Sequence, residues 1–262
     1  MKRIIQIVAF ILFAIALIGL MGFIYLEREN QILNEISVRV CRDGDKGFLV
    51  KKELYEIIER TDSVRAKTIK QIDVNTLEKI IGKNPYIENV DIFVNINNNL
   101  IVNVKEKNAI LRIFNQTGEG YYINENAEIL PLSNKFSPRV LIANGYINTS
   151  YVKGFGNIYD SVYYSPITKN SIIIDLFELT KIIRQNNFLQ ALISQIYVNS
   201  KGEFDLIPQL GKQIIHLGSI ENIEKKLNKL EIFYKKAMMK AGWEKYATIN
   251  LEYKDQIVCT KK

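Results

Sequence analysis

An uncharged apolar segment near the N-terminus constrains this chain more than any other feature of its sequence. Residues 4–26 carry no charge, and Gln6 is their one strongly polar side chain. As an α-helix rising about 1.5 Å per residue, the segment would be roughly 34 Å long, enough to cross the ~30 Å hydrocarbon core of a bilayer. A core helix of a soluble protein would be shorter and would carry a polar stripe. We therefore predict a transmembrane helix at residues 4–26, with the lipid bilayer as its partner.

A cleaved signal peptide is the alternative, because Ala14-Ile15-Ala16 imitates a small-residue cleavage site. The apolar run continues to Leu26, where a signal peptide would already have become polar, and this favours a retained anchor. Lys2 and Arg3 precede the segment, so the positive-inside rule places residues 1–3 in the cytoplasm. We expect a single-pass protein of the cytoplasmic (inner) membrane, with the bulk of the chain on the outer, extracytoplasmic side.

The inventory of reactive side chains argues against catalysis. The 262 residues include one histidine and two cysteines, which excludes a histidine-based zinc site and paired Cys-x-x-Cys motifs. Neither a Walker loop nor a Gly-x-Ser-x-Gly elbow is present, and Gly154-Phe155-Gly156 lacks the third glycine of a dinucleotide fingerprint. Glu53 and Glu56 could pair as acid and base, but they fall on the polar side of an expected helix. We predict that the protein is not an enzyme and holds no cofactor or metal.

The chain is moderately basic, with 35 Lys and Arg against 28 Asp and Glu, a formal charge of +7. A basic exported domain can meet anionic headgroups or cell-wall polymers, although solvated lysines are the simpler explanation. No basic cluster is interleaved with aromatic residues, so we expect no nucleic-acid partner. Cys41 and Cys259 would form a disulfide only in an oxidising compartment, and the sequence leaves both states open.

After a linker at 27–35, residues 36–107 have the pattern of a small α+β domain. Residues 36–40 alternate like a short strand. Apolar residues with helical spacing then follow Gly47, at Val50, Leu54, Ile57 and Ile58.

A second helix is expected around its capping signals. Asp73 or Asn75 can act as the N-cap, and Glu78 lies three residues after Asn75, which is the spacing of a capping box. Gly82 followed by Pro85 ends this helix.

Two alternating segments then predict a hairpin. Residues 90–96 and 100–104 alternate apolar and polar side chains, and Asn97-Asn98-Asn99 between them tolerates a tight turn. We expect Ile92 and Val102 to be buried against the two helices.

Residues 108–262 predict a second, β-rich domain with at least two packed helices. Strand-like segments broken by turn residues lie at 112–114, 121–123, 139–143, 196–198, 203–207, 213–217, 247–253 and 256–260. A helix with apolar residues on one face covers 176–183, and Asn199-Ser200-Lys201-Gly202 forms a hairpin turn. The predicted fold class is therefore α+β: one transmembrane helix, a small α+β domain and a β-rich domain.

One long amphipathic helix is expected at 220–241. Its apolar stripe is Ile220, Ile223, Leu227, Leu230, Tyr234, Met238 and Ala241. The lysines off this stripe are Lys225, Lys226, Lys229, Lys235, Lys236 and Lys240. The helix could lie on a membrane surface, but packing on the sheet with solvated lysines is the favoured prediction.

The order of these elements resembles the bacterial cell-division family FtsQ/DivIB, which has a single span, a POTRA domain and a C-terminal β domain. The similar stretches are 84–90 (NPYIENV), 104–109 (VKEKNA), 121–124 (YYIN) and 129–132 (ILPL). Two positions depart from the family pattern: Asn124 replaces the usual Asp, and Ala127 replaces the usual Gly. The resemblance covers nearly the whole chain, and the order of elements carries more weight than any one motif.

The resemblance implies a non-catalytic bitopic scaffold of the division machinery at the septum. Its partners would be membrane proteins of the FtsB/FtsL type and the septal peptidoglycan synthase complex. In this family the last sheet edge receives a strand from FtsB. The residues here that match that edge are Ile249, Asn250, Leu251, Glu252 and Tyr253, with Glu252 reversing the charge of the family's arginine. The alternative is that this strand is the last core strand and is covered by the chain's own tail. A weaker contact is expected on the POTRA-like domain at Tyr86 and Glu106.

Two other functions remain open at this stage. A membrane-anchored envelope enzyme with an unrecognised active site would show turnover, whereas a scaffold would only bind. A POTRA-type export or assembly module would normally carry several tandem POTRA units, and the sequence has one.

Overall fold

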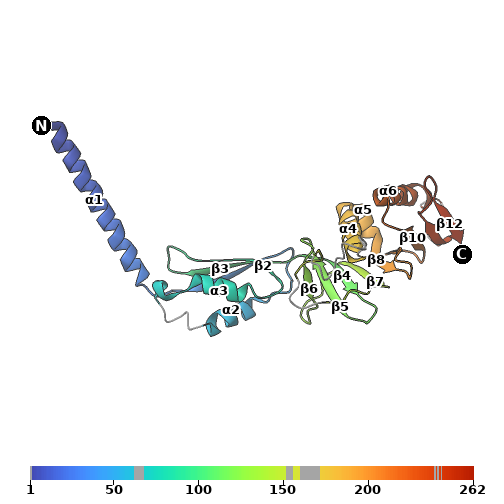
Figure 1. Ribbon diagram of the computed structural model, residues 1–262, viewed down its shortest axis with the longest axis horizontal. Helices are drawn as coiled ribbons and strands as arrows, with labels where there is room; N and C mark the ends of the chain where they lie inside the picture. Colours follow the sequence, from blue (N-terminus) through green and yellow to red (C-terminus); the bar gives the residue numbers. More distant parts are fainter. Residues whose placement is uncertain are drawn as a thin grey trace. The chain divides into compact units, whose positions relative to one another are not determined.

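The computed structural model describes residues 2–61, 68–151, 156–159, 172–238, 240, 242 and 244–262 (Figure 1). Contacts divide the chain into two compact units, Met1–Glu106 (unit 1) and Lys107–Lys262 (unit 2). Gly154 and Phe155, considered above for a dinucleotide motif, and Ala241 of the expected long helix lie outside the described residues.

The N-terminal apolar segment forms α1 (Lys2–Glu29). Its stretch Gln6–Phe23 has a mean hydropathy of 2.5, and none of it is buried against the rest of the chain. By length and composition this stretch can cross a membrane. The helix therefore fits a single-pass membrane protein.

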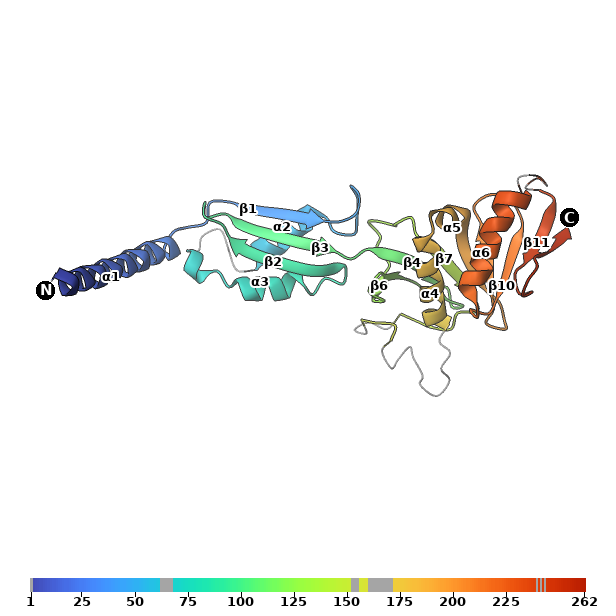
Figure 2. The same cartoon turned by 90° about the horizontal axis from the view of Figure 1, so that it is seen from above.

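Beyond α1, unit 1 is a three-stranded sheet with helices on one side (Figures 1 and 2). Its elements are β1 (Ile36–Cys41), α2 (Lys51–Arg60), the 3-10 helix η2 (Ile69–Gln71), α3 (Val74–Ile81), β2 (Ile87–Val94) and β3 (Leu100–Glu106). The strand order is β1-β3-β2, with β1 parallel and β2 antiparallel to the central β3. The predicted order of strand, two helices and hairpin is confirmed.

The core of unit 1 lies between this sheet and the helices. Val102 is fully buried, and Ile92, its registered neighbour on β2, is 5% exposed. Both belong to one apolar cluster with Leu54 of α2 and Leu77 of α3. The prediction that Ile92 and Val102 face the helices is confirmed, because alternation along a strand sends every second side chain to the same face.

Of the two caps predicted for α3, the structure uses Asp73. Its Oδ1 accepts the N–H of Thr76 at 3.0 Å, and its Oδ2 accepts the Thr76 hydroxyl at 2.6 Å. These hydrogen bonds lower the pKa of Asp73, since they favour its charged form. The predicted capping box is wrong, because the Glu78 carboxylate accepts the N–H of Ile92 on β2 instead.

Unit 2 is built on a nine-stranded mixed sheet of order β12-β11-β10-β9-β8-β7-β4-β5-β6. The strands are β4 (Ala109–Phe114), β5 (Gly120–Asn124), β6 (Ile129–Pro131), β7 (Leu141–Gly145), β8 (Ile193–Val198), β9 (Phe204–Pro208), β10 (Ile214–Gly218), β11 (Tyr246–Asn250) and β12 (Val258–Lys261). The helices are α4 (Ile172–Gln185), α5 (Asn187–Leu192) and α6 (Ile223–Phe233), which continues as the π-helical turn η3 (Tyr234–Met238). The fold is the predicted α+β arrangement.

The helices α4, α5 and α6 gather on one side of this sheet (Figure 1). Leu227, Leu230, Tyr234 and Met238 of α6 and η3 are buried in the same cluster as the strands. The prediction that this stripe packs on the sheet is confirmed. The expectation of a solvated lysine is wrong for Lys226, which is buried.

Three turns of unit 2 share one asparagine-based geometry. In each turn the asparagine Oδ1 accepts two backbone N–H groups, those of the second and the fourth residue after it. The fourth residue is a glutamate, and its carboxylate accepts the asparagine Nδ2. The three pairs are Asn115 with Glu119, Asn124 with Glu128, and Asn199 with Glu203. The residue before each glutamate has a positive φ, and at Ala127 this φ is 61°. Asn124 and Ala127, the two residues that depart from the family pattern, thus belong to a turn of the same kind as the other two. An amide at 124 suits Glu128, because a second carboxylate would repel it.

Candidate protein-binding edge

The C-terminal segment predicted to be the open sheet edge is an inner strand. β11 lies between β10, to which it is parallel, and β12, to which it is antiparallel. Ile249 and Leu251 are fully buried. The prediction that this segment is the edge is wrong, because neighbouring strands already pair with both sides of β11.

The outermost strand at this end of the sheet is β12. Among the described strands it pairs with β11 alone. Val258, Thr260 and Lys261 are exposed, whereas Cys259 is half-buried against the core of unit 2. Its outer side therefore presents backbone donors and acceptors that no described strand pairs with, which is the usual template for a partner strand.

One contact shows which N–H groups of β12 are free. The N–H of Lys262 donates to the carbonyl of Lys245, on the β11 side, at 3.3 Å. N–H groups point to alternate sides along a strand, so the N–H of Lys261 is directed away from β11.

The opposite edge of the sheet, β6, is closed. The N–H of Ile129 donates to the carbonyl of Gly156 at 2.8 Å, and Pro131 has no N–H to offer. This three-residue strand cannot extend the sheet as β12 can.

Side chains also guard both edges of the unit 1 sheet. The Tyr55 hydroxyl of α2 accepts the N–H of Val38 on β1 at 3.2 Å. The Glu78 carboxylate of α3 accepts the N–H of Ile92 on β2 at 2.9 Å. A partner strand would have to displace these acceptors, and no described side chain blocks β12 in this way. Edge protection of this kind discourages strand addition.

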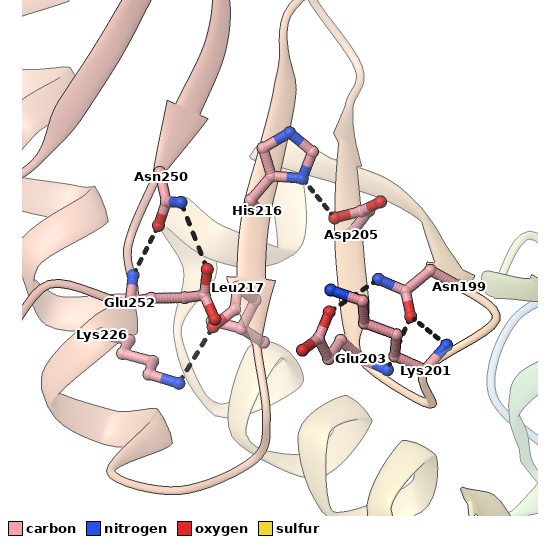
Figure 3. Close-up of polar contacts among 9 residues, drawn as sticks. All are labelled: Asn199, Lys201, Glu203, Asp205, His216, Leu217, Lys226, Asn250 and Glu252. Atoms are coloured by element: carbon pink, nitrogen blue, oxygen red, sulfur yellow. Dashed lines mark hydrogen bonds and ion pairs between the residues drawn. The ribbon is translucent and has the colours of Figure 1, made fainter.

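Two lysines of α6 hold backbone carbonyls of segments next to β11. Lys226 Nζ donates to the carbonyl of Leu217 at 2.9 Å (Figure 3) and to that of Ser219 at 2.8 Å. Lys229 Nζ donates to the carbonyls of Leu251 and Tyr253. Burial lowers the pKa of Lys226, because desolvation disfavours its charged form, although the Glu252 carboxylate opposes this shift.

The remaining residues of the predicted site have separate roles. The Asn250 Oδ1 accepts the N–H of Glu252 at 2.8 Å, and the Asn250 Nδ2 donates back to the Glu252 carboxylate at 3.2 Å (Figure 3). Tyr253 is 49% exposed, in the loop between β11 and β12. Of the predicted set, Asn250, Glu252 and Tyr253 have side chains that a partner can reach.

Of the two residues predicted for the weaker contact, Glu106 is internal. Its carboxylate accepts the N–H groups of Phe48 and Leu49 at 2.6 and 3.1 Å and pairs with Arg42 at 3.3 Å. A buried carboxylate with three donors cannot serve as a contact, so this prediction is corrected. Tyr86 is half-buried and stacks on Phe48, with ring centroids 4.6 Å apart.

The single histidine pairs with a carboxylate on the neighbouring strand. His216 Nδ1 lies 2.6 Å from Asp205 Oδ1 (Figure 3). Among the described residues, no group of three His, Cys, Asp or Glu side chains could hold a metal ion. Cys41 and Cys259 are both free thiols.

The alternative that the predicted edge strand is covered by the chain's own tail is confirmed, because β12 pairs with one side of β11. The strand at 256–260 was predicted, but its position as the outermost strand was not. The roles of Glu78 and Tyr55 at the edges of the unit 1 sheet were not predicted either, since the sequence carries no local signal for them.

Taken together, the apolar helix, the small α+β unit and the β-rich unit define an α+β protein whose N-terminal helix fits a single membrane span. A POTRA-like domain model matches residues 31–105, and the model for the FtsQ/DivIB C-terminal related family matches residues 108–260. The chain belongs to the FtsQ/DivIB C-terminal related family. A search of curated proteins found no match to this sequence. Domains of both kinds are typically non-catalytic, and the family points to a cell-division scaffold.

Proposed function

We propose that this protein is a non-catalytic, single-pass scaffold of the bacterial division machinery. It would act on the outer side of the cytoplasmic membrane and be enriched at the division septum. The partners that the family suggests are membrane proteins of the FtsB/FtsL type, with the septal peptidoglycan synthase complex linked through them.

The observation that carries this proposal is the open β12 edge. A partner strand added there would gain main-chain hydrogen bonds along Val258–Lys261. Tyr253 is the side-chain anchor that we propose, because it is exposed beside this edge and aromatic residues are enriched among binding hot spots. Lys229 supports the site by fixing the Tyr253 carbonyl.

The test removes one edge N–H while leaving its strand exposed. The partner is captured from membranes with the full chain in detergent, and its soluble segment is titrated against wild-type protein and Lys261→Pro. We expect Lys261→Pro to weaken binding about tenfold or more, since a lost hydrogen bond and the proline ring together cost at least ~1.4 kcal/mol.

The matched control is Lys261→Ala, which removes the same charge and retains the N–H. Its affinity should stay within about threefold of wild type, since an exposed rim charge contributes little. Equal binding by Lys261→Pro and Lys261→Ala would mean that no partner strand pairs along β12.

Orientation has its own test. With Lys2 and Arg3 in the cytoplasm, an alkaline phosphatase fused after Lys262 should be active, because this enzyme folds only outside the cytoplasm. An inactive fusion, at normal expression, would reverse the orientation. A mature protein beginning near Leu17 would make α1 a signal peptide instead.

A further inference from the structure

Unit 2 contains a cavity of about 510 Å³ that none of the residues of β10, β11 or β12 lines. Its walls come from β4, from the segment 137–142 that leads into β7, from the end of α4, from α5, from the start of β8 and from Gln209 just after β9. The charged side chains among its described lining residues are Arg112, Arg139 and Arg184, with no carboxylate among them. A recess whose charges are all of one sign concentrates ligands of the opposite sign.

Arg112 is fixed in place by its neighbours. Its guanidinium carbon lies 4.6 Å from the ring centroid of Phe114 and 5.4 Å from that of Tyr122. Its Nη1 donates to the Ser137 hydroxyl at 3.0 Å. Its Nε is buried and has no acceptor among the described residues. An arginine held by stacking and a single neutral acceptor keeps donors for a ligand.

The other two arginines differ in how far they are neutralised. Arg139 is exposed and forms no hydrogen bond or ion pair with another described residue. Arg184 pairs with Glu125 at 3.2 Å, and Glu125 also accepts the amide of Asn108 at 2.8 Å. Glu125 lies outside the cavity lining and offsets one arginine, so the site keeps an excess of positive charge.

The rest of the lining combines an apolar floor with amide side chains. The floor includes Ile110, Ile183 and Ile193, and Gln190 and Gln209 supply amides. Arginine forks match carboxylates in a bidentate manner. Aliphatic contacts would contribute nothing to an inorganic anion, but they suit the side chains next to an acidic residue in a peptide. The volume lies within the usual range of ligand-binding clefts, about 300–1,000 Å³.

We propose that this cavity binds an acidic segment of a protein partner, with glutamate or aspartate carboxylates on Arg112 and Arg139 and an adjacent aliphatic side chain on the isoleucine floor. The choice of a protein ligand rests on the proposed scaffold function. The site itself does not depend on β12.

The probe is a fluorescein-labelled peptide, Ala-Glu-Glu-Leu-Glu-Glu-Ala, titrated against the full chain in nanodiscs of zwitterionic lipid. Its matched control has glutamine at each glutamate. The glutamate peptide should bind about tenfold more tightly than the glutamine peptide, and Arg139→Gln should lower its affinity at least about fivefold, because the bidentate charge-assisted hydrogen bonds between its guanidinium and a peptide carboxylate are lost. Arg139 is exposed, so this variant should fold normally. Arg60→Gln, on unit 1, removes the same charge outside the cavity and should bind as wild type does.

Equal affinity for the two peptides, or unchanged binding by Arg139→Gln, would overturn the proposal. Inorganic phosphate that displaces the peptide at equal concentration would make this a small-anion site, and binding only to anionic vesicles would make it a lipid site; either result overturns a peptide ligand. Lys261→Pro should retain peptide binding. Failure of the cavity and failure of the β12 edge are therefore distinguishable.

Discussion

Replacement of Glu106 by alanine should destabilise unit 1 by about 3–5 kcal/mol, the range for breaking a buried ion pair. Glu106 is the last residue of β3. Its carboxylate fixes the segment before α2, because it accepts the N–H groups of Phe48 and Leu49 and pairs with Arg42. Without it, two buried N–H groups lose their acceptor and the arginine loses its counter-ion. Hydrogen exchange of the Phe48 and Leu49 amides and urea unfolding of unit 1, both in the full chain, measure the effect.

Glu88→Ala is the matched control on the same sheet. Glu88 pairs with Lys105 at 2.9 Å, but the Lys105 side chain is 61% exposed. Removing such a surface pair should cost less than ~1 kcal/mol. If Glu106→Ala were as mild as Glu88→Ala, the carboxylate would not hold this segment in solution.

Gly47 belongs to the same arrangement, because a Cβ at this position would lie 2.2 Å from Glu106 Oε1.

The second large effect is expected for Ile92→Ala, which should destabilise unit 1 by about 2–5 kcal/mol. The side chain is 5% exposed and packs in the cluster between the sheet and the helices. Its truncation leaves a cavity that the surrounding helices fill only partly. The hydrogen bond from its backbone N–H to Glu78 remains available to alanine, so the loss reports packing alone. Urea unfolding monitored by exchange of the β2 and β3 amides measures it.

Phe93→Ala is the control for this prediction. Phe93 is the next residue on β2, points to the other face and is 43% exposed. Its truncation should cost less than ~1 kcal/mol, as is usual for exposed positions. A larger loss at Phe93 than at Ile92 would mean that β2 is shifted by one residue, since a one-residue shift exchanges the two faces.

Local patterns in the sequence predicted much of this architecture. The uncharged run at 4–26 predicted α1, and alternation at 90–104 predicted the β2–β3 hairpin with Ile92 inside. The stripe from Ile223 to Met238 predicted the packed face of α6. These features depend on residues within one or two turns or strands of each other, so hydrophobic periodicity is enough to find them.

The candidate site was predictable only in part. The resemblance to the FtsQ/DivIB family predicted a binding site on the C-terminal strands, and the chain belongs to the FtsQ/DivIB C-terminal related family. It also suggested Glu106 as a contact residue, which the structure places inside unit 1. A short motif identifies a residue type, but it does not say whether that side chain is directed to solvent or to a backbone more than fifty positions earlier.

The sequence by itself determined the apolar N-terminal helix, the two-domain order and the hairpin turn that begins at Asn199. Tertiary structure alone decided which strand is left open. β11 is covered because β10 pairs with it in parallel and β12 folds back against it, while Tyr55 and Glu78 close the edges of unit 1. Tertiary structure also decided the burial of Lys226. Its position off the apolar stripe predicted a solvated side chain, but it is buried because its ammonium donates to the carbonyls of Leu217 and Ser219. Whether a backbone or side-chain group is hydrogen-bonded depends on partners that are distant in sequence, and local periodicity does not reveal these partners.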